Sequence, residues 1–105
     1  MQLVQLQQSY QAFQKLDAEV AALAVAPMSS VEGAREAAKA TFPMMADADH
    51  IVAETYGVYN LLGDTLAAPS VFVIDTDGHI LWGHIGRNPG DRPSVKMILD
   101  KLPQN

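Results

Sequence analysis

The stretch from Ala68 to Gly86, APSVFVIDTDGHILWGHIG, decides the fold because it predicts two antiparallel strands joined by a tight turn. Its first part, Ser70–Ile74, is rich in the β-branched and aromatic residues that favour strands. Residues 75–78 have the composition of a turn, and His79–Ile85 follows as the return strand. The sequence therefore predicts a β-hairpin, and Pro69 stands directly before it.

The residues at the start of the chain predict a helix and then a buried strand. Apolar residues recur every three or four positions from Leu3 to Leu16, which is the pattern of an amphipathic helix. Glu19–Ala26 is an apolar run closed by Pro27, as expected of a parallel strand covered on both faces. An alanine-rich helix is the competing interpretation of this run.

Three further helices are predicted from apolar spacing and from residues that cap helix ends. The first is Val31–Lys39, the second runs through Tyr56 until Gly57, and the third follows residue 94. A loop over residues 60–68 separates the second from the hairpin. The predicted amino-terminal caps are Ser29 or Ser30, Asp47 or Asp49, and Ser94.

Composition limits the class of protein. The length of 105 residues fits one domain, 1–105, and the net charge of 7 − 12 = −5 works against binding to nucleic acid or anionic lipid. No apolar run approaches the roughly 20 residues that span a bilayer, and the start lacks the basic flank of a signal peptide. We therefore expect a cytoplasmic protein with no membrane partner.

The order helix, strand, helix, extended segment, helix, strand, strand, helix predicts an α/β protein with helices on a mixed sheet. Three segments resemble the peroxiredoxin branch of the thioredoxin superfamily, and more narrowly the alkyl hydroperoxide reductase/thiol-specific antioxidant (redoxin) family. They are TFPMMADAD from Thr41, AETYGVY from Ala53 and APSVFVIDTDGHI from Ala68. The resemblance extends from Leu3 to Leu102 and implies a truncated thioredoxin-like fold, with a small mixed sheet flanked by helices, in an antioxidant oxidoreductase family.

The resemblance also shows which part of the family pattern is missing. The reactive cysteine of this family lies on the turn before the helix that Leu3–Leu16 resembles, so the chain is expected to begin just after the active site. Peroxide reduction needs a thiolate, and the chain has no cysteine. Methionine is no substitute, because its sulfoxide needs a separate reductase. We therefore assign no catalytic residue, cofactor or metal, and expect no peroxidase activity from this chain alone.

Ala68 and Pro69 are the residues that the resemblance places against a substrate. Many peroxiredoxins carry an active-site arginine just before the Phe-x-Ile-Asp strand, where this chain has Pro69. Pro69 looks more like the cis-proline of thioredoxin-like reductases, whose backbone meets the substrate. The resemblance thus implies a cis Ala68–Pro69 bond, and the alternative is that Pro69 merely starts an edge strand.

The missing part includes a strand that the resemblance places in the middle of the sheet, between the strands at 19–26 and 70–74. Without it, two strand edges keep unpaired backbone groups. Either these strands pair directly or another chain covers the gap. Open edges favour exchange between protomers, so we expect an intertwined homodimer that completes the sheet. Repacking of the helices within one chain is the alternative.

Other residues are weaker candidates for a site. Five could bind a metal by type, without the spacing of a metal site: Asp47, Asp49, His50, His79 and His84. Caps, edge-strand positions and turn chemistry explain these residues and the pair Asp75 and Asp77 better. The charged loop residues fit a solvated ion pair, and the aromatic residues fit packing, better than a pocket: Arg87, Asp91, Arg92, Tyr56, Tyr59 and Trp82.

Three functional hypotheses remain. The favoured one is a cysteine-free peroxiredoxin-like protein that acts through oligomerisation or partner binding. The second is a fragment of a thiol peroxidase or thiol-disulfide oxidoreductase whose cysteine-bearing part is missing. The third is a small module that binds a ligand or peptide with the Pro69 loop and the loop over residues 60–67.

Overall fold

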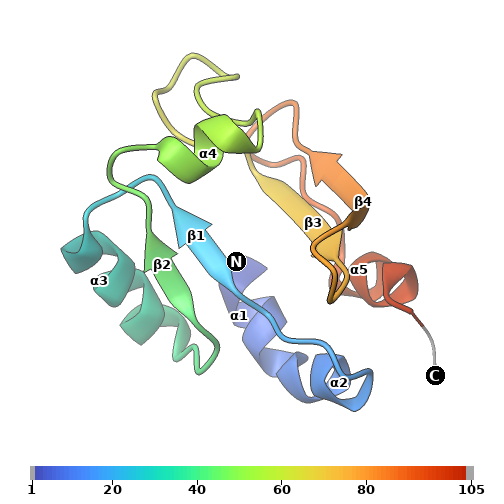
Figure 1. The fold of residues 1–105 in the computed structure, drawn as a ribbon. Helices are drawn as coiled ribbons and strands as arrows, with labels where there is room; N and C mark the ends of the chain where they lie inside the picture. Colours follow the sequence, from blue (N-terminus) through green and yellow to red (C-terminus); the bar gives the residue numbers. More distant parts are fainter. Residues whose placement is uncertain (1, 104–105) are drawn as a thin grey trace.

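The computed structural model describes residues 2–103 and confirms an α/β fold (Figure 1). Helices and strands alternate through the first half of the described chain, and the hairpin with one helix forms the end. In chain order the elements are α1 (Gln2–Gln8), α2 (Tyr10–Lys15), β1 (Ala22–Ala24), α3 (Met28–Ala38), β2 (Met44–Ala46), α4 (Ile51–Thr55), β3 (Ser70–Ile74), β4 (Ile80–Ile85) and α5 (Val95–Lys101).

The N-terminal half, residues 2–46, contains a parallel strand pair and three helices. Strand β1 pairs with β2 in the register Ala22↔Met44 to Ala24↔Ala46. The core beside this pair is apolar and closely packed, and its buried members are Val31, Ala38, Ala40, Phe42 and Met44. The half-buried residues Leu3, Leu6 and Tyr10 of α1 and α2 pack against it, so the apolar stripe predicted from Leu3 to Leu16 faces the core.

Two boundaries in this half differ from the prediction. The first helix is divided at Ser9, yet Ser9 N still donates to Gln5 O at 3.2 Å, so the apolar stripe continues across the break. Helix α3 begins at Met28, and Ser29 and Ser30 lie inside its first turn, so the cap predicted there is wrong. Pro27 occupies the cap position with extended backbone, and its carbonyl accepts from Ser30 N at 3.0 Å.

Strand β1 confirms the strand interpretation over the alanine-rich helix, but it is only Ala22–Ala24. It was predicted to be covered on both faces, and this is wrong, because Ala22 and Leu23 are half-buried and Ala24 is exposed. Strand β1 has a partner on one edge only, so fewer residues are held in the ladder.

The C-terminal half, residues 70–102, is the predicted hairpin followed by one helix. Strands β3 and β4 are antiparallel, with Ser70 opposite Ile85 and an irregularity between Val73 and Ile74. The return strand begins at Ile80, because the backbone carbonyl of His79 accepts from Asp75 N at 2.9 Å and keeps His79 in the turn. Ser94 caps α5 as predicted, since its hydroxyl accepts from Met97 N at 3.1 Å.

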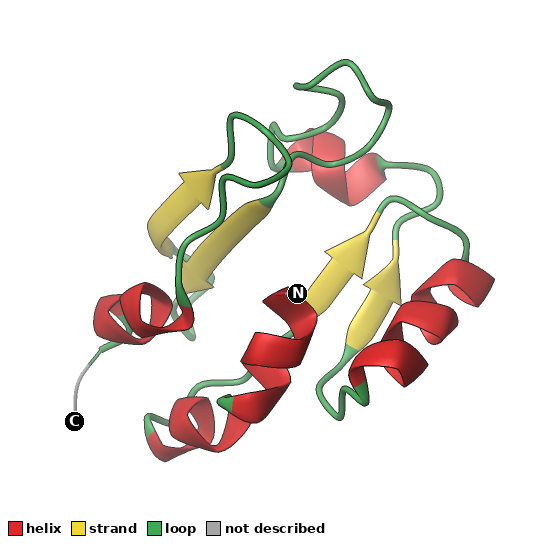
Figure 2. Cartoon of the chain, turned by 180° about the vertical axis from the view of Figure 1, so that it is seen from behind, coloured by secondary structure: helices red, strands yellow, loops and turns green. Residues whose placement is uncertain are grey.

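The four strands form two separate sheets, β1–β2 and β3–β4. Strands β1 and β3 face each other across a gap and do not pair, so the direct pairing considered from the sequence does not occur. Figure 2 shows that β1, β2 and β4 run in one direction and that β3 runs in the other. Each of β1 and β3 therefore keeps one open edge.

No helix within residues 2–103 is long and apolar enough to cross a membrane.

Candidate functional site

The space between the two sheets is an open cleft of about 1340 Å³. It runs along both open strands, from Val20 to Ala26 on one side and from Ser70 to Thr76 on the other. Apolar side chains in or next to three helices also line it: Phe13 and Leu16 near α2, Val52, Ala53 and Tyr56 near α4, and Ile98 and Leu102 near α5. This lining is predominantly apolar, so the cleft favours an apolar occupant over a charged one.

Ala68 and Pro69 lie in the wall of this cleft, at the start of β3. Ala68 is 2% exposed, and its N–H donates to Val58 O at 2.9 Å. Pro69 O accepts from Gly86 N at 2.7 Å, which ties the residue to the chain just after β4. The Ala68–Pro69 bond is trans, as are all peptide bonds within residues 2–103, so the expected cis bond is wrong. Trans is the lower-energy isomer of an X–Pro bond, and Pro69 stands where a strand with an open edge begins.

Gly86 is a structural requirement of this region that the sequence did not reveal. A Cβ atom at Gly86 would lie 2.5 Å from Asp91 O and 2.9 Å from Pro69 O. Both neighbours are backbone atoms, so neither can move aside as a flexible side chain would. Only glycine allows the chain after β4 to pass this close to Pro69. No local sequence signal separates this glycine from an ordinary loop glycine.

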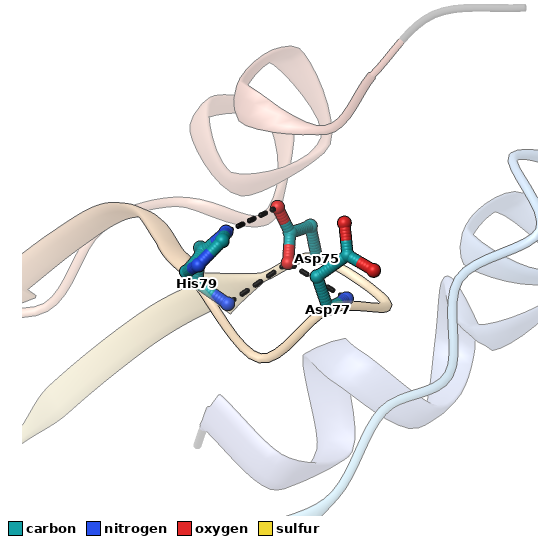
Figure 3. Close-up of side chains that lie close together, drawn as sticks. All are labelled: Asp75, Asp77 and His79. Carbon is teal, nitrogen blue, oxygen red and sulfur yellow. Dashed lines mark hydrogen bonds and ion pairs between the residues drawn. The ribbon is translucent and has the colours of Figure 1, made fainter.

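Asp75, Asp77 and His79 form the one group of three metal-ligating side chains within residues 2–103 (Figure 3). The Asp75 carboxylate, however, already accepts from Asp77 N at 2.9 Å and from His79 N at 2.8 Å. Its other oxygen lies 3.6 Å from His79 Nδ1. These contacts are those of a closed turn in which an aspartate bonds the backbone ahead of it. We interpret the group as the hairpin turn predicted from the sequence.

One acidic residue before α4, Asp47, accepts hydrogen bonds from the start of the helix. Asp47 is 7% exposed, and its carboxylate accepts from Val52 N at 3.2 Å and Ala53 N at 2.9 Å. His50 occupies the cap position of α4 with left-handed backbone, so neither Asp47 nor Asp49 is the cap residue that was predicted, although the Asp47 carboxylate satisfies two of the first amides of the helix. His50 stacks on Tyr59 with ring centroids 4.0 Å apart, and its Nδ1 lies 3.1 Å from Glu54 Oε1. This segment therefore holds α4 against the loop that follows.

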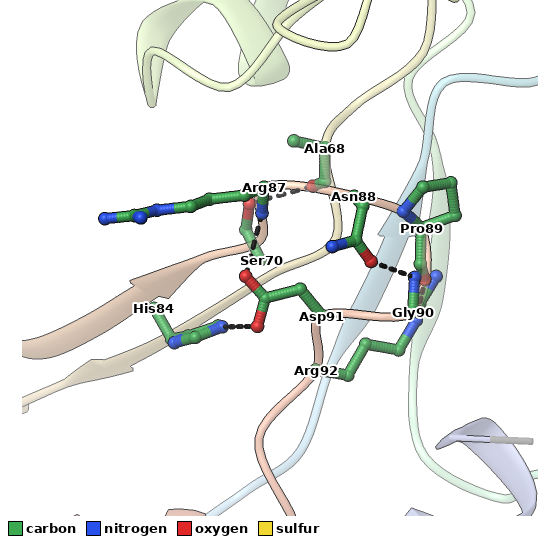
Figure 4. Close-up of polar contacts among 9 residues, drawn as sticks. All are labelled: Ala68, Ser70, His84, Arg87, Asn88, Pro89, Gly90, Asp91 and Arg92. Atoms are coloured by element: carbon green, nitrogen blue, oxygen red, sulfur yellow. Dashed lines mark hydrogen bonds and ion pairs between the residues drawn. The ribbon is translucent and has the colours of Figure 1, made fainter.

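The charged loop after β4 is closed by Asp91 (Figure 4). Its carboxylate accepts from Arg87 N at 2.9 Å and lies 3.0 Å from His84 Nε2, while the Arg87 side chain extends away. The Arg87 amide hydrogen bond, and after it the His84 contact, lower the pKa of Asp91 below its ordinary value. Arg92 donates to Gln2 Oε1 at 2.8 Å and so joins this loop to α1. The contacts brace the loop, in place of the solvated pair of side chains expected from the sequence.

Of the three aromatic residues considered from the sequence, Tyr56 lines the cleft, where its ring is 5.0 Å from that of Phe72. Trp82 lies outside the cleft, with Lys101 Nζ 5.7 Å from its ring centroid. Within the described residues the cleft therefore has apolar walls, aromatic packing and a proline at its edge. The 105-residue sequence contains no cysteine and so supplies no thiol to the cleft.

Comparison with known protein families assigns the chain to a family. Residues 1–82 match the profile of the AhpC/TSA family, which is most of the chain. The chain belongs to the AhpC/TSA family. This confirms the resemblance stated from the sequence, and the C-terminal residues outside the match include the second half of β4 and all of α5. No curated protein sequence matches the chain.

Solved structures confirm the thioredoxin-like fold of this AhpC/TSA protein. AhpC of Enterococcus faecalis superposes with a TM-score of 0.85 at 23% identity, covering 95% of this chain and 61% of its own. AhpC of Mycobacterium tuberculosis gives 0.80 at 19%, covering 95% and 57%. The mitochondrial 2-Cys peroxiredoxin of Plasmodium falciparum gives 0.78 at 17%, covering 95% and 62%. The chain thus spans about three fifths of the length of these structures.

Proposed function

We propose that this chain is a single AhpC/TSA-family domain, residues 1–105, that has no peroxidase activity of its own and acts by associating with another polypeptide that completes its sheet. Association takes one of two forms, the homodimer expected from the sequence or a complex with a different protein. Ala68 and Pro69 are proposed to face the occupant of the cleft. Location in the cytoplasm stays a prediction of the sequence.

The observation that carries this proposal is the cleft between two open strand edges in a chain without cysteine. Unpaired backbone groups along an apolar edge are stabilised when another strand pairs with them. The reaction typical of thiol peroxidases requires a thiolate that these residues do not contain. The fold therefore supports binding more directly than it supports redox chemistry.

The test combines solution mass with peroxide consumption on one purified sample. Light scattering over a dilution series reports self-association, and a hydrogen peroxide assay with excess dithiothreitol as the reductant reports any peroxidase turnover by the chain. We expect peroxide consumption equal to that of the same buffer with dithiothreitol and no protein. Turnover well above buffer, removed by denaturing the chain, would show that the domain is not redox-silent.

A second candidate function is a fragment of a thiol peroxidase or thiol-disulfide oxidoreductase. The partial coverage of the solved structures, 61% of the E. faecalis chain, favours it. In this case the nucleophile would belong to a segment of the full protein that precedes Met1. Reading the coding sequence upstream for an in-frame cysteine codon after a strand pattern separates the two candidates.

A further inference from the structure

We propose that the cleft binds one single extended strand of a different protein, apolar on both faces and flanked at one end by a basic residue, which pairs with β1 and β3 at once. The inference rests on the proposed function, because it names the kind of partner that completes the sheet. The donor of the strand is a different protein, and a second copy of this chain is the competing occupant.

The open edge of β1 is defined by its hydrogen bonds on the other side. Ala22 N donates to Pro43 O at 3.0 Å, and Ala24 O accepts from Asp47 N at 2.8 Å. Both residues therefore direct their backbone groups towards β2. In a parallel ladder the intervening residue directs its N–H and C=O to the opposite side. Leu23 thus presents its amide and carbonyl to the cleft.

The open edge of β3 follows from the hairpin register. Pro69 O accepts from Gly86 N, so Pro69, Val71 and Val73 direct their backbone groups towards β4. Phe72 lies opposite Gly83, and a Cβ atom at Gly83 would be 2.9 Å from the Phe72 ring, as expected where side chains of a non-hydrogen-bonded pair approach closely. Phe72 therefore directs its amide and carbonyl towards the cleft, where Leu23 lies on the other side.

The shape of the cleft fits a strand better than a small molecule. Its volume of about 1340 Å³ exceeds the usual range for small-molecule pockets, which is roughly 300 to 1,000 Å³. It follows the whole length of β3, and a strand of five residues is about 17 Å long. Apolar side chains near α2, α4 and α5 line the cleft around both strands, so an inserted strand should be apolar on both faces, like a central strand of a covered sheet.

The charged residues at one end of the cleft indicate which residue type flanks the inserted strand. Strand β1 begins at the end of the cleft where β3 finishes, because the two run in opposite directions (Figure 2). Asp17 and Glu19 precede β1 and Asp75 follows β3, so three carboxylates line this end. Arg92 is the remaining charged residue in the lining, and it donates to Gln2. A basic residue beside the inserted strand complements this acidic end.

The strands of this chain argue against a second copy as the donor. Every strand within residues 2–103 already pairs with another strand, β1 with β2 and β3 with β4. A second copy could insert a single strand only after breaking one of these pairs. A free segment of a different protein meets no such cost.

The experiment uses the full chain and synthetic peptides. The probe is a ten-residue peptide with alternating valine, isoleucine and phenylalanine between flanking lysines. A first control replaces the lysines by glutamates, and a second carries N-methyl groups on two adjacent central residues, which removes one donor towards each edge. Amide hydrogen exchange is followed by NMR at Leu23 and Phe72, and light scattering excludes peptide aggregation.

We expect the lysine-flanked peptide to slow exchange at both amides by at least about tenfold, and the N-methyl peptide to leave both unchanged. The glutamate-flanked peptide should bind about fivefold more weakly at low salt. Leu23→Asp should abolish binding, and Leu81→Asp, on β4 outside the cleft, should preserve it. The wild-type exchange data stand even if Leu23→Asp does not fold.

Three results would overturn the inference. They are unchanged exchange at both amides, slowing at one edge alone, and a peptide-free dimer in which both amides are already protected. The last result would leave the proposed function standing, since the sheet would then be completed by a second copy. Peroxide turnover would overturn the proposed function, while the exchange data would still decide whether the cleft binds a strand.

Discussion

The two halves of the molecule are held together differently, although each contains a two-stranded sheet. In the N-terminal half, helices flank β1–β2 and enclose a core in which Phe42 is 1% exposed. In the C-terminal half, buried apolar residues are few, Val73 and Ile98, and the exposed large ones are Ile74, Ile80, Leu81, Ile85 and Met97. The N-terminal half therefore carries its own core, whereas the C-terminal half leaves much of its apolar surface exposed.

The largest change in stability is expected for one of two phenylalanines, one of which lies in each half. Phe42→Ala should lower the free energy of unfolding by about 3–5 kcal/mol, because it leaves a cavity in a closed core. Phe72→Ala should cost about 1–2 kcal/mol, because the half-buried Phe72 ring borders the open cleft. Urea unfolding followed by circular dichroism measures both. Equal losses would mean that the cleft is as well packed as the core.

The next comparison uses two glycines. Gly86→Ala should destabilise by about 1–3 kcal/mol, because its methyl group meets two backbone oxygens. Gly33→Ala lies inside α3 with open space around it and should stabilise by about 0.5–1 kcal/mol through helix propensity. Thermal unfolding should shift in opposite directions for the two variants. A shift in the same direction would contradict the tight approach at Gly86.

A smaller effect is expected at the connection between the halves. Asp47→Ala should cost about 1–2 kcal/mol, because the first amides of α4 lose their acceptor. Asp49→Ala is the matched control, since this exposed residue should change stability by less than about 0.5 kcal/mol. Amide exchange at Ala53 reports the helix end directly. Unchanged exchange at Ala53 in Asp47→Ala would show that these hydrogen bonds contribute nothing.

The sequence predicted the elements better than their limits. The hairpin at Ser70–Ile74, the Ser94 cap and the order of elements follow from local chemistry, and all are found. Strand β1 was predicted from Glu19 to Ala26 and covers Ala22–Ala24, because strand length depends on pairing partners that a local pattern does not contain. Residue type predicts Ser29 or Ser30 as the cap of α3, whereas Pro27 occupies the cap position and determines where the helix begins.

The candidate site was predicted in outline only. The open edges of the two strands were expected from the family resemblance, and the separate sheets confirm that the strands do not pair directly. The contacts of Asp91 with the Arg87 amide and with His84, and the close approach at Gly86, depend on how the chain returns after β4. Such contacts depend on the tertiary structure, so they cannot be predicted from residue type and spacing.

The smallest effects concern pH, and they separate the halves again. In the C-terminal half the pKa of Asp91 is lowered, so its contribution to stability is present above the unfolded pKa of about 3.9 and is lost as pH falls through the lower folded value. Asp91→Asn should remove this dependence below about pH 4. Fluorescence of Trp82, which stacks near His84, follows the loop during an acid titration.

In the N-terminal half the dependence has the opposite sign. The hydrogen bond from the Tyr10 hydroxyl to Glu19 raises the pKa of Tyr10, with burial and the Glu19 charge adding to it. Stabilisation by the protonated phenol is therefore complete below about pH 10 and is lost as pH rises through the folded value. Tyr10→Phe should make helical circular dichroism insensitive to pH in this range. If acid opened the N-terminal half and alkali opened the C-terminal half, these assignments would be reversed, and each half would depend on groups other than Asp91 and Tyr10.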